Sequence, residues 1–348
     1  MVSEPHNSVI LDNKDFEKFF SLLVEKYTIF APSQEDEGYT FAKIDAPQSL
    51  DLHHTNTNLQ IKDFFFPQTE TLFAFDKNLK ATKREEDEGK EQTKCRILFG
   101  VRPCDATAVY FLDKVFQTNS PPDPYYVKKR SVTRIISLAC TDPLSTCFCT
   151  SVGCGPDSEK GSDIIFFELD GRYLIKQITA EGKEILAGVQ ELLRPVTDKD
   201  IEDKDRSMVA ARHKLRKIFE VSEFVKRLDD FEAPYWERLH EKCLGCGVCT
   251  YMCPTCHCFD MTDEMTQSGG RRIRTWDSCM FPLFTQHASG HNPRPTQKER
   301  MRQRIMHKFS YAPKLFDEIF CVGCGKCVVH CPVNLDIRSI IQQIMEEQ

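Results

Sequence analysis

Short apolar runs separated by polar loop residues dominate the first two thirds of the chain. Three of these runs predict buried strands: residues 71–75, 95–101 and 132–139. Residues 163–169 and 172–178 flank an Asp170-Gly171 pair and predict a β-hairpin. Residues 13–27 instead carry apolar side chains at helical spacing and predict an amphipathic helix. These elements together predict a mixed α/β domain.

The hydrophobic pattern changes after residue 200. Residues 211–228 carry an apolar stripe that predicts a connecting helix, and Ala233-Pro234 marks a boundary after it. Residues 295–309 predict a polar helix, and the isoleucines near the end predict a closing helix capped by Asn334. We therefore expect an α+β protein, with a mixed α/β N-terminal domain over residues 1–232 and a helical domain over residues 233–348.

Composition narrows the class of protein. A chain of 348 residues with 41% hydrophobic content can bury one large or two ordinary cores. The net charge is -6, and no basic tract is free of acidic neighbours, which argues against a nucleic-acid partner. The stretch Lys83 to Glu91 predicts a solvated acidic loop.

Cysteine usage indicates the compartment. No apolar run approaches the ~20 residues that span a bilayer, so no membrane span is expected. The first 13 residues lack the apolar region of a secretion signal. Seventeen cysteines in such a chain predict a reducing, cytoplasmic environment, where thiols bind metal rather than form disulfides.

Two stretches repeat one cysteine spacing, C-x2-C-x2-C-x3-C-P, at residues 243–254 and 321–332. This is the bacterial ferredoxin run for [4Fe-4S] clusters, in which the fourth cysteine ligates the other cluster. The sequence thus predicts two [4Fe-4S] clusters. Cross-ligation predicts Cys243, Cys246, Cys249 and Cys331 for the first cluster. It predicts Cys321, Cys324, Cys327 and Cys253 for the second.

Zinc is the alternative metal for these cysteines. Four-cysteine zinc sites also use C-x2-C pairs, but two pairs suffice for them. Zinc therefore leaves unexplained a triple of cysteines at strict spacing followed by Cys-Pro, found twice. The wide separation of the two runs indicates helices between the clusters rather than the compact ferredoxin fold.

A second group of cysteines follows two of the predicted strands. Cys104 and Cys140 each come directly after a strand, and Cys147, Cys149 and Cys154 follow Cys140 in a Pro/Gly-rich loop. Strand ends of one α/β sheet meet at the same edge, where sites usually form. We expect Cys104, Cys140, Cys147 and Cys149 to hold a third iron-sulfur cluster, with zinc as the open alternative.

Three further cysteines, Cys256, Cys258 and Cys279, lack an obvious fourth ligand for a tetrahedral site. We interpret them as weak S–H donors that shield a nearby cluster, with a further metal as the alternative. His257 is interpreted as structural. The arginines over 271–274 and 294–304 are interpreted as solvated; the alternatives are that they bind an acidic partner or raise a cluster potential.

Several motifs together resemble one family. They are FGVRPCD at 99–105, the Cys-Phe-Cys-Thr core within 140–156, the extension at 253–259, WDSC at 276–279 and HASGHNPR at 287–294. From about Tyr27 to the C-terminus the chain resembles the family of [NiFe] sulfhydrogenase beta subunits and the corresponding iron-sulfur subunits of anaerobic sulfite reductases. Cys154 departs from the pattern, because a glycine is expected there.

The resemblance implies a cytoplasmic electron-transfer subunit with a C-terminal helical dicluster ferredoxin domain. Such a subunit lies between a flavin subunit that handles NAD(P)H and a catalytic subunit of hydrogenase or sulfite reductase type. No G-x-G-x-x-G follows a strand, so dinucleotide binding by this chain has no support in its residues.

Three functions are weighed on these residues. The preferred one is an electron-relay subunit that is itself non-catalytic. The second is an enzyme that reduces a disulfide or sulfur compound at the Cys104 and Cys140–Cys154 site. The third is a scaffold organised by zinc.

Overall fold

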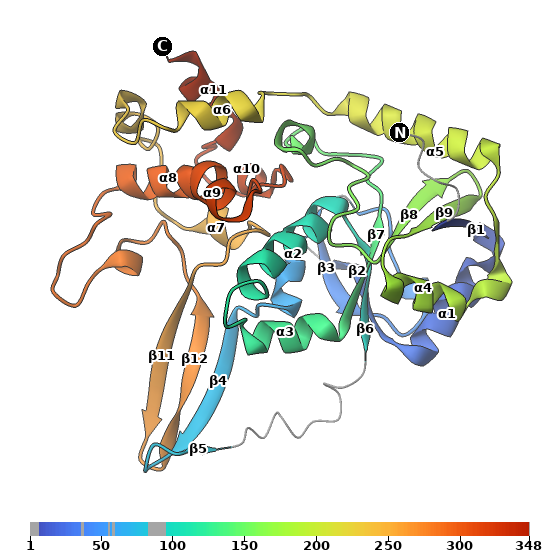
Figure 1. The fold of residues 1–348 in the computed structure, drawn as a ribbon, viewed down its shortest axis with the longest axis horizontal. Coiled ribbons are helices and arrows are strands. Elements are labelled where there is room, and N and C mark those ends of the chain that lie inside the picture. The colour runs from blue at the N-terminus through green and yellow to red at the C-terminus, as the bar shows by residue number, and fades with distance from the viewer. Residues whose placement is uncertain (1–6, 36–37, 55, 58–59, 83–94, 348) are drawn as a thin grey trace.

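A mixed eight-stranded sheet forms the centre of the N-terminal region (Figure 1). This computed structural model describes residues 7–35, 38–54, 56–57, 60–82 and 95–347, so the acidic stretch 83–91 lies outside the described residues. The strand order is β10-β1-β9-β8-β7-β6-β2-β3. The strands are β1 (Ser8–Asp12), β2 (Thr28–Glu35), β3 (Gly38–Lys43), β6 (Arg96–Val101), β7 (Thr133–Leu138), β8 (Ile164–Leu169), β9 (Arg172–Gln177) and β10 (Leu193–Pro195). The central strands β2, β6, β7 and β8 are parallel, and the other pairings are antiparallel.

Helices cover both faces of this sheet. They are α1 (Phe16–Lys26), α2 (Pro103–Phe116), α3 (Pro124–Ser131), α4 (Ala180–Ala187) and α5 (Asp198–Lys214). Ile136 of β7 packs with side chains of α1 and α4, whereas its neighbour Ile135 packs with α2 and α3. This alternation follows from the two-residue period of a strand and explains why the central strands read as continuous apolar runs. The predicted mixed α/β class is confirmed.

The predicted helix over 211–228 is wrong. Helix α5 begins earlier, at Asp198, where Thr197 and Asp200 form a capping box, and it ends at Lys214. A new helix, α6 (Val221–Arg227), follows only after a non-helical stretch. The apolar residues of that stretch have other partners, since Phe219 packs against Phe148 and Leu215 lines a cysteine-rich pocket.

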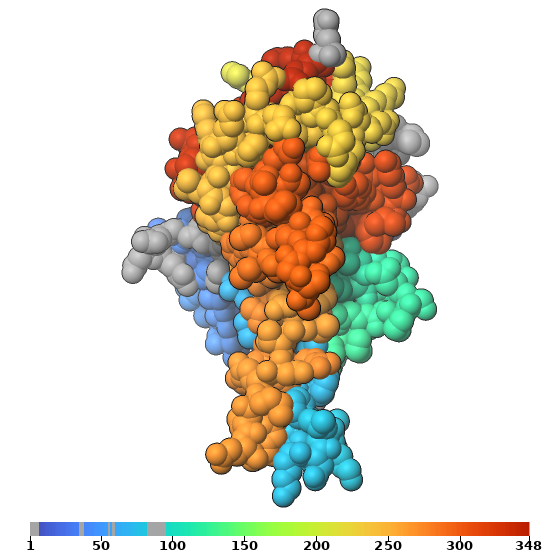
Figure 2. Space-filling view, turned by 90° about the vertical axis from the view of Figure 1, so that its left-hand side faces the viewer, coloured from blue at the N-terminus to red at the C-terminus, as the bar shows by residue number. Residues whose placement is uncertain are grey.

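A second sheet projects from the body as an arm (Figures 1 and 2). Its antiparallel order is β11-β12-β4-β5. Its strands are β4 (Thr69–Asp76), β5 (Ala81–Thr82), β11 (Phe259–Thr266) and β12 (Gly269–Trp276). Strands from both predicted segments, 1–232 and 233–348, thus share one sheet. The β11–β12 hairpin lies between the two ferredoxin runs and was not predicted, because the residues of β11 are almost all exposed and carry little hydrophobic alternation.

Besides this hairpin, the C-terminal region contains short helices joined by loops. They are α7 (Val248–Tyr251), α8 (Gln297–Met306), α9 (Ala312–Phe316), α10 (Lys326–Val329) and α11 (Ile337–Glu346), with a π-helical stretch at His307–Tyr311 between α8 and α9. The polar helix predicted at 295–309 is therefore present. The predicted cap is wrong: Asp336, not Asn334, accepts a hydrogen bond from the Arg338 amide at the start of α11. No helix in the described part of the chain is long and apolar enough to cross a membrane.

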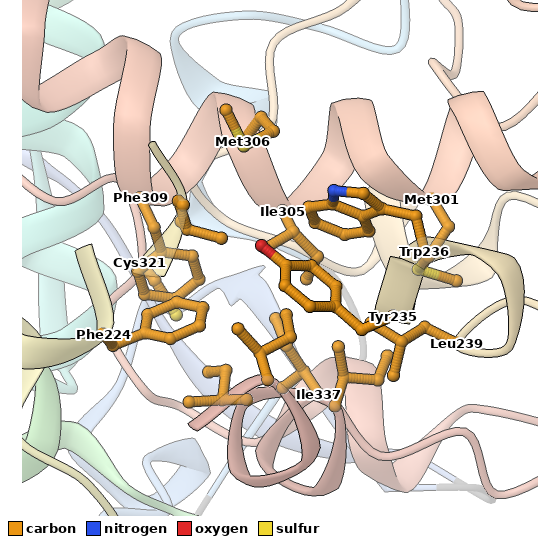
Figure 3. Close-up of a cluster of buried hydrophobic side chains, with 14 of the residues drawn as sticks. Phe224, Tyr235, Trp236, Leu239, Met301, Ile305, Met306, Phe309, Cys321 and Ile337 are labelled. Atoms are coloured by element: carbon orange, nitrogen blue, oxygen red, sulfur yellow. The ribbon is translucent and has the colours of Figure 1, made fainter. Parts of the chain in front are cut away.

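One apolar cluster holds these helices together (Figure 3). Trp236 and Tyr235 pack against Ile305 of α8, and the isoleucines of α11 close the cluster from the opposite side. Phe224 and Phe309 form an edge-to-face pair with ring centroids 5.1 Å apart. Cys321, the first cysteine of the second run, belongs to the same cluster, so the core fixes the position of a candidate metal ligand.

Candidate metal centres

The four cysteines predicted for the first cluster line a single pocket of about 400 Å³. We call Cys243, Cys246, Cys249 and Cys331 site 1. Cys331 comes from the second run, so the fold brings together residues far apart in sequence. Two of the sulfurs accept hydrogen bonds. Gln297 Nε2 donates to Cys243 Sγ at 3.0 Å, and the Leu335 amide nitrogen donates to Cys331 Sγ at 3.2 Å.

Site 1 reaches the molecular surface. Cys246 is exposed, and Leu244 beside it is 68% exposed. Gly247, with φ of 74°, begins α7 in the left-handed region that favours glycine. The first run therefore forms a tight turn whose outer side is open to solvent.

The cysteines predicted for the second cluster, Cys321, Cys324, Cys327 and Cys253, are site 2. Burial raises the pKa of the three site 2 thiols that come from the second run, that of Cys321 to about 12, and the neighbouring Cys253 sulfur raises them further. Cys253, from the first run, thus lies among the cysteines of the second. Its own sulfur is 3.2 Å from Lys308 Nζ.

The N-terminal region forms one wall of site 2. Helix α2 packs on the second run, where Phe111 and Phe320 stack with centroids 5.2 Å apart. The Phe148 amide donates to the Gly323 carbonyl at 2.8 Å. Gly323 has a φ of 62°, and a Cβ there would lie 2.5 Å from Cys149 Cα. The two loops approach each other so closely that only glycine fits.

Site 3 consists of Cys104, Cys140, Cys147 and Cys149, which line one pocket of about 430 Å³. Cys104 lies in the first turn of α2 after β6, and Cys140 follows β7, so the shared sheet edge brings them together as expected. Burial raises the pKa of the Cys147 thiol to about 11 and that of Cys149 to about 12. Cys324 of site 2 also lines this pocket, so sites 2 and 3 are neighbours.

Cys154 is not among the residues that line the site 3 pocket in the described structure. Its thiol interacts with the Thr107 hydroxyl, and burial raises its pKa to about 11. The Cys154 amide donates to the Cys149 carbonyl at 3.0 Å, which closes the loop around Gly153. Its position agrees with a supporting role for the loop rather than with a direct one at the pocket.

Cys256, Cys258 and Cys279 each form a hydrogen bond with another cysteine. The Cys256 thiol is hydrogen-bonded to the Cys253 sulfur, and Cys279 to Cys258. The first contact fits the predicted shielding of a cluster ligand by an S–H donor, which stays a prediction. His257 stacks edge-on to His307, and burial lowers its pKa to about 4.

Buried cations surround site 2. Burial by itself lowers the pKa of Lys308, but the Cys253, Cys256 and Cys321 sulfurs outweigh it, so its pKa lies well above the usual value. Lys62 donates to the carbonyls of Cys253 and Cys256 and lies 3.9 Å from the centroid of the Trp276 ring. Lys326 pairs with Asp105 at 2.9 Å, with both side chains at most 3% exposed. No local pattern pointed to Lys62 or Lys308, because isolated lysines are normally solvated.

The interpretation of the arginines as solvated is wrong for α8. Arg300, Arg302 and Arg304 are all buried. Arg304 lines the site 1 pocket and hydrogen-bonds the Cys327 thiol of site 2, so it touches both sites. On β12, Arg274 is also buried and pairs with Glu70 and Asp123, whereas Arg271 and Arg272 lie near the surface.

The cysteine side chains of sites 1 and 3 line pockets and do not converge on one point. Among the described residues, no three Cys, His, Asp or Glu side chains converge where one metal ion could bind. Tetrahedral zinc needs such convergence, because Zn–S bonds are about 2.3 Å long. A [4Fe-4S] cubane instead offers four separate iron corners to ligands placed around it. Four cysteines around one pocket, as at sites 1 and 3, are the ligand set that a cubane takes.

Comparison with known proteins agrees with this chemistry. A family model described as a 4Fe-4S dicluster domain matches residues 242–335, which contain every cysteine of sites 1 and 2. The chain is 33% identical over 344 residues to the sulfhydrogenase 2 subunit beta of Pyrococcus furiosus, covering 97% of this chain and 98% of that protein. The chain belongs to the sulfhydrogenase beta subunit family. The expected resemblance is thereby confirmed, and the domain implies two [4Fe-4S] clusters. Site 3 lies outside the matched range.

Proposed function

We propose that this chain is the electron-relay subunit of a redox complex, with one [4Fe-4S] cluster at each of sites 1, 2 and 3. Bound clusters of this kind accept and release single electrons. The chain would connect a flavin subunit that handles NAD(P)H with a catalytic subunit of hydrogenase or sulfite reductase type.

The contiguity of the three sites carries this proposal. Cys324 is a site 2 residue that also lines the site 3 pocket, and Arg304 touches residues of both site 1 and site 2. An electron entering at one end of this row therefore has a neighbouring site at each step. Site 1, with the exposed Cys246, gives the row an opening to a partner.

Site 3 supports a cluster better than it supports independent thiol chemistry. Thiol attack on a disulfide needs the thiolate form. Burial raises the pKa of Cys104, Cys140, Cys147 and Cys149, so free thiols there would be protonated at neutral pH. A bound cluster would instead hold these cysteines as thiolates, because a metal-bound cysteine is deprotonated.

Metal analysis and one substitution test the proposal. Anaerobically purified protein should contain about twelve iron and twelve sulfide per chain, or about eight if site 3 holds no cluster. Cys149→Ser should lower iron by about four and stop electron flow between the flavin partner and the catalytic subunit in the assembled complex. The partner's own reduction of a dye by NAD(P)H should persist.

Cys95→Ser is the matched control, because Cys95 lies just before β6, at the end of the strand opposite Cys104. It should keep full iron and full electron flow. Zinc in place of iron under iron-replete anaerobic conditions would overturn the proposal. So would turnover of a sulfur compound by the purified chain that Cys149→Ser abolishes without loss of iron.

A further inference from the structure

Two buried cations of the α8 segment face sites 1 and 2. Arg304 is 4% exposed and Lys308 is 3% exposed. They lie four residues apart, so they occupy neighbouring positions on one side of the helix. Lys308 falls within the π-helical stretch His307–Tyr311, where Lys308, Phe309 and Ser310 are all buried. Such π-helical turns are often associated with functional sites.

Lys308 makes direct contact with a residue of site 2. Its Nζ is 3.2 Å from Cys253 Sγ, 3.0 Å from Thr255 Oγ1 and 3.1 Å from the Phe320 carbonyl oxygen. Arg304 hydrogen-bonds Cys327 and lines the site 1 pocket. Its Nε is buried and has no hydrogen-bond partner within the described structure.

No carboxylate of the described residues neutralises either cation. No salt bridge to Arg304 or Lys308 is formed by the residues that the structure describes, whereas the nearby Lys326 has Asp105. Burying an unpaired charge is costly, so a compensating anion is required close by. Four cysteine thiolates around a cluster supply that anion, and each electron that the cluster accepts makes it more negative.

We infer that Lys308 and Arg304 set the reduction potential of the site 2 cluster. This inference rests on the proposed function, because it needs a cluster at site 2. Burial disfavours the more negative, reduced cluster, and a fixed positive charge against its ligands opposes that effect. Lys308 acts on site 2 through Cys253, and Arg304 acts on sites 1 and 2 together. One electron enters and no proton is transferred, since both side chains stay charged.

Redox titration followed by electron paramagnetic resonance tests this role. Lys308→Met removes the charge at similar length. At a fixed ambient potential it should lower the ratio of reduced to oxidised site 2 cluster about tenfold, which equals a midpoint shift of about 59 mV for one electron. Lys308→Arg keeps the charge and should stay within about threefold of wild type. Arg304→Met should lower the ratios of both site 1 and site 2.

Lys314→Met is the matched control, because this lysine of α9 has a side chain that is 65% exposed. It should leave all potentials unchanged. If Lys308→Met loses the cluster, Lys308→Gln replaces it, since the amide donates hydrogen bonds without a charge. If the charge-removing variants keep wild-type iron content and an unchanged site 2 potential, this inference is overturned and the proposed function is not affected. Absence of iron from the wild-type protein would instead overturn the proposed function.

Discussion

The two ferredoxin runs have the same spacing but opposite surroundings. Leu244 in the first run is 68% exposed, whereas Val322, at the same position of the second run, is 2% exposed. Cys246 is likewise exposed, and its counterpart Cys324 is buried. The site 1 pocket is lined by C-terminal residues only, whereas Gly323 and Cys324 of the second run also face the loops after β6 and β7.

This difference shows that the ligands of a cluster and the environment that tunes its potential have separate origins. Spacing alone determines that three cysteines of one turn and one of the other can surround a cluster. Surroundings determine solvent access and nearby charge, both of which tune a cluster potential. In this molecule, site 1 is open to solvent at Cys246, and site 2 lies in the interior between sites 1 and 3.

The largest expected effect comes from the glycines at the same position of the two runs, Gly245 and Gly323. Gly245→Ala should cost about 1–2 kcal/mol, because it places a side chain in the left-handed region. Its φ is 69°, and the atoms nearest to its added Cβ belong to the flexible Gln297 side chain, the first at 3.1 Å. Gly323→Ala adds overpacking against the Cys149 backbone and should cost about 3 kcal/mol or more. Anaerobic urea unfolding of the full chain gives both values; equal losses would contradict the difference in packing.

A second test replaces the fourth cysteine of each run by serine, in two separate variants. Cys331→Ser should weaken the site 1 cluster, and Cys253→Ser should weaken the site 2 cluster, because each crosses to the other run. Each variant should lose up to about four iron atoms, and the resonance that disappears should differ between them. Loss of the cluster adjacent in sequence, rather than the distant one, would refute cross-ligation.

The smallest expected effect comes from a neutral donor. Gln297→Leu removes the amide that lies 3.0 Å from Cys243 Sγ, and it should lower the reduced fraction of the site 1 cluster. The expected change is roughly threefold in the ratio of reduced to oxidised cluster, because neutral hydrogen bonds are about half as strong as charge-assisted ones. Redox titration measures it. A larger change in this ratio than Lys308→Met causes at site 2 would contradict the expectation that the buried charge has the stronger effect on cluster potential.

Much of the fold could be predicted from local pattern. The strands β6, β7, β8 and β9 and the helix α1 have strong apolar periodicity and were predicted within a few residues. The helix over 211–228 was mispredicted, because its apolar stripe is divided between helices and an extended stretch that packs on site 3. The β11–β12 hairpin was missed, since its stability comes from pairing with the distant strand β4.

The sequence by itself determined the chemistry of sites 1 and 2, because cysteine spacing is a local property that a single turn of backbone enforces. It also placed Cys104 and Cys140 at one sheet edge, since parallel strands share their carboxyl ends. Only the tertiary structure decided which run is exposed, that site 3 adjoins site 2, and that Lys62, Arg304 and Lys308 are buried around the cysteines. Burial and charge at a point depend on elements far apart in the chain, and no local pattern of residues records them.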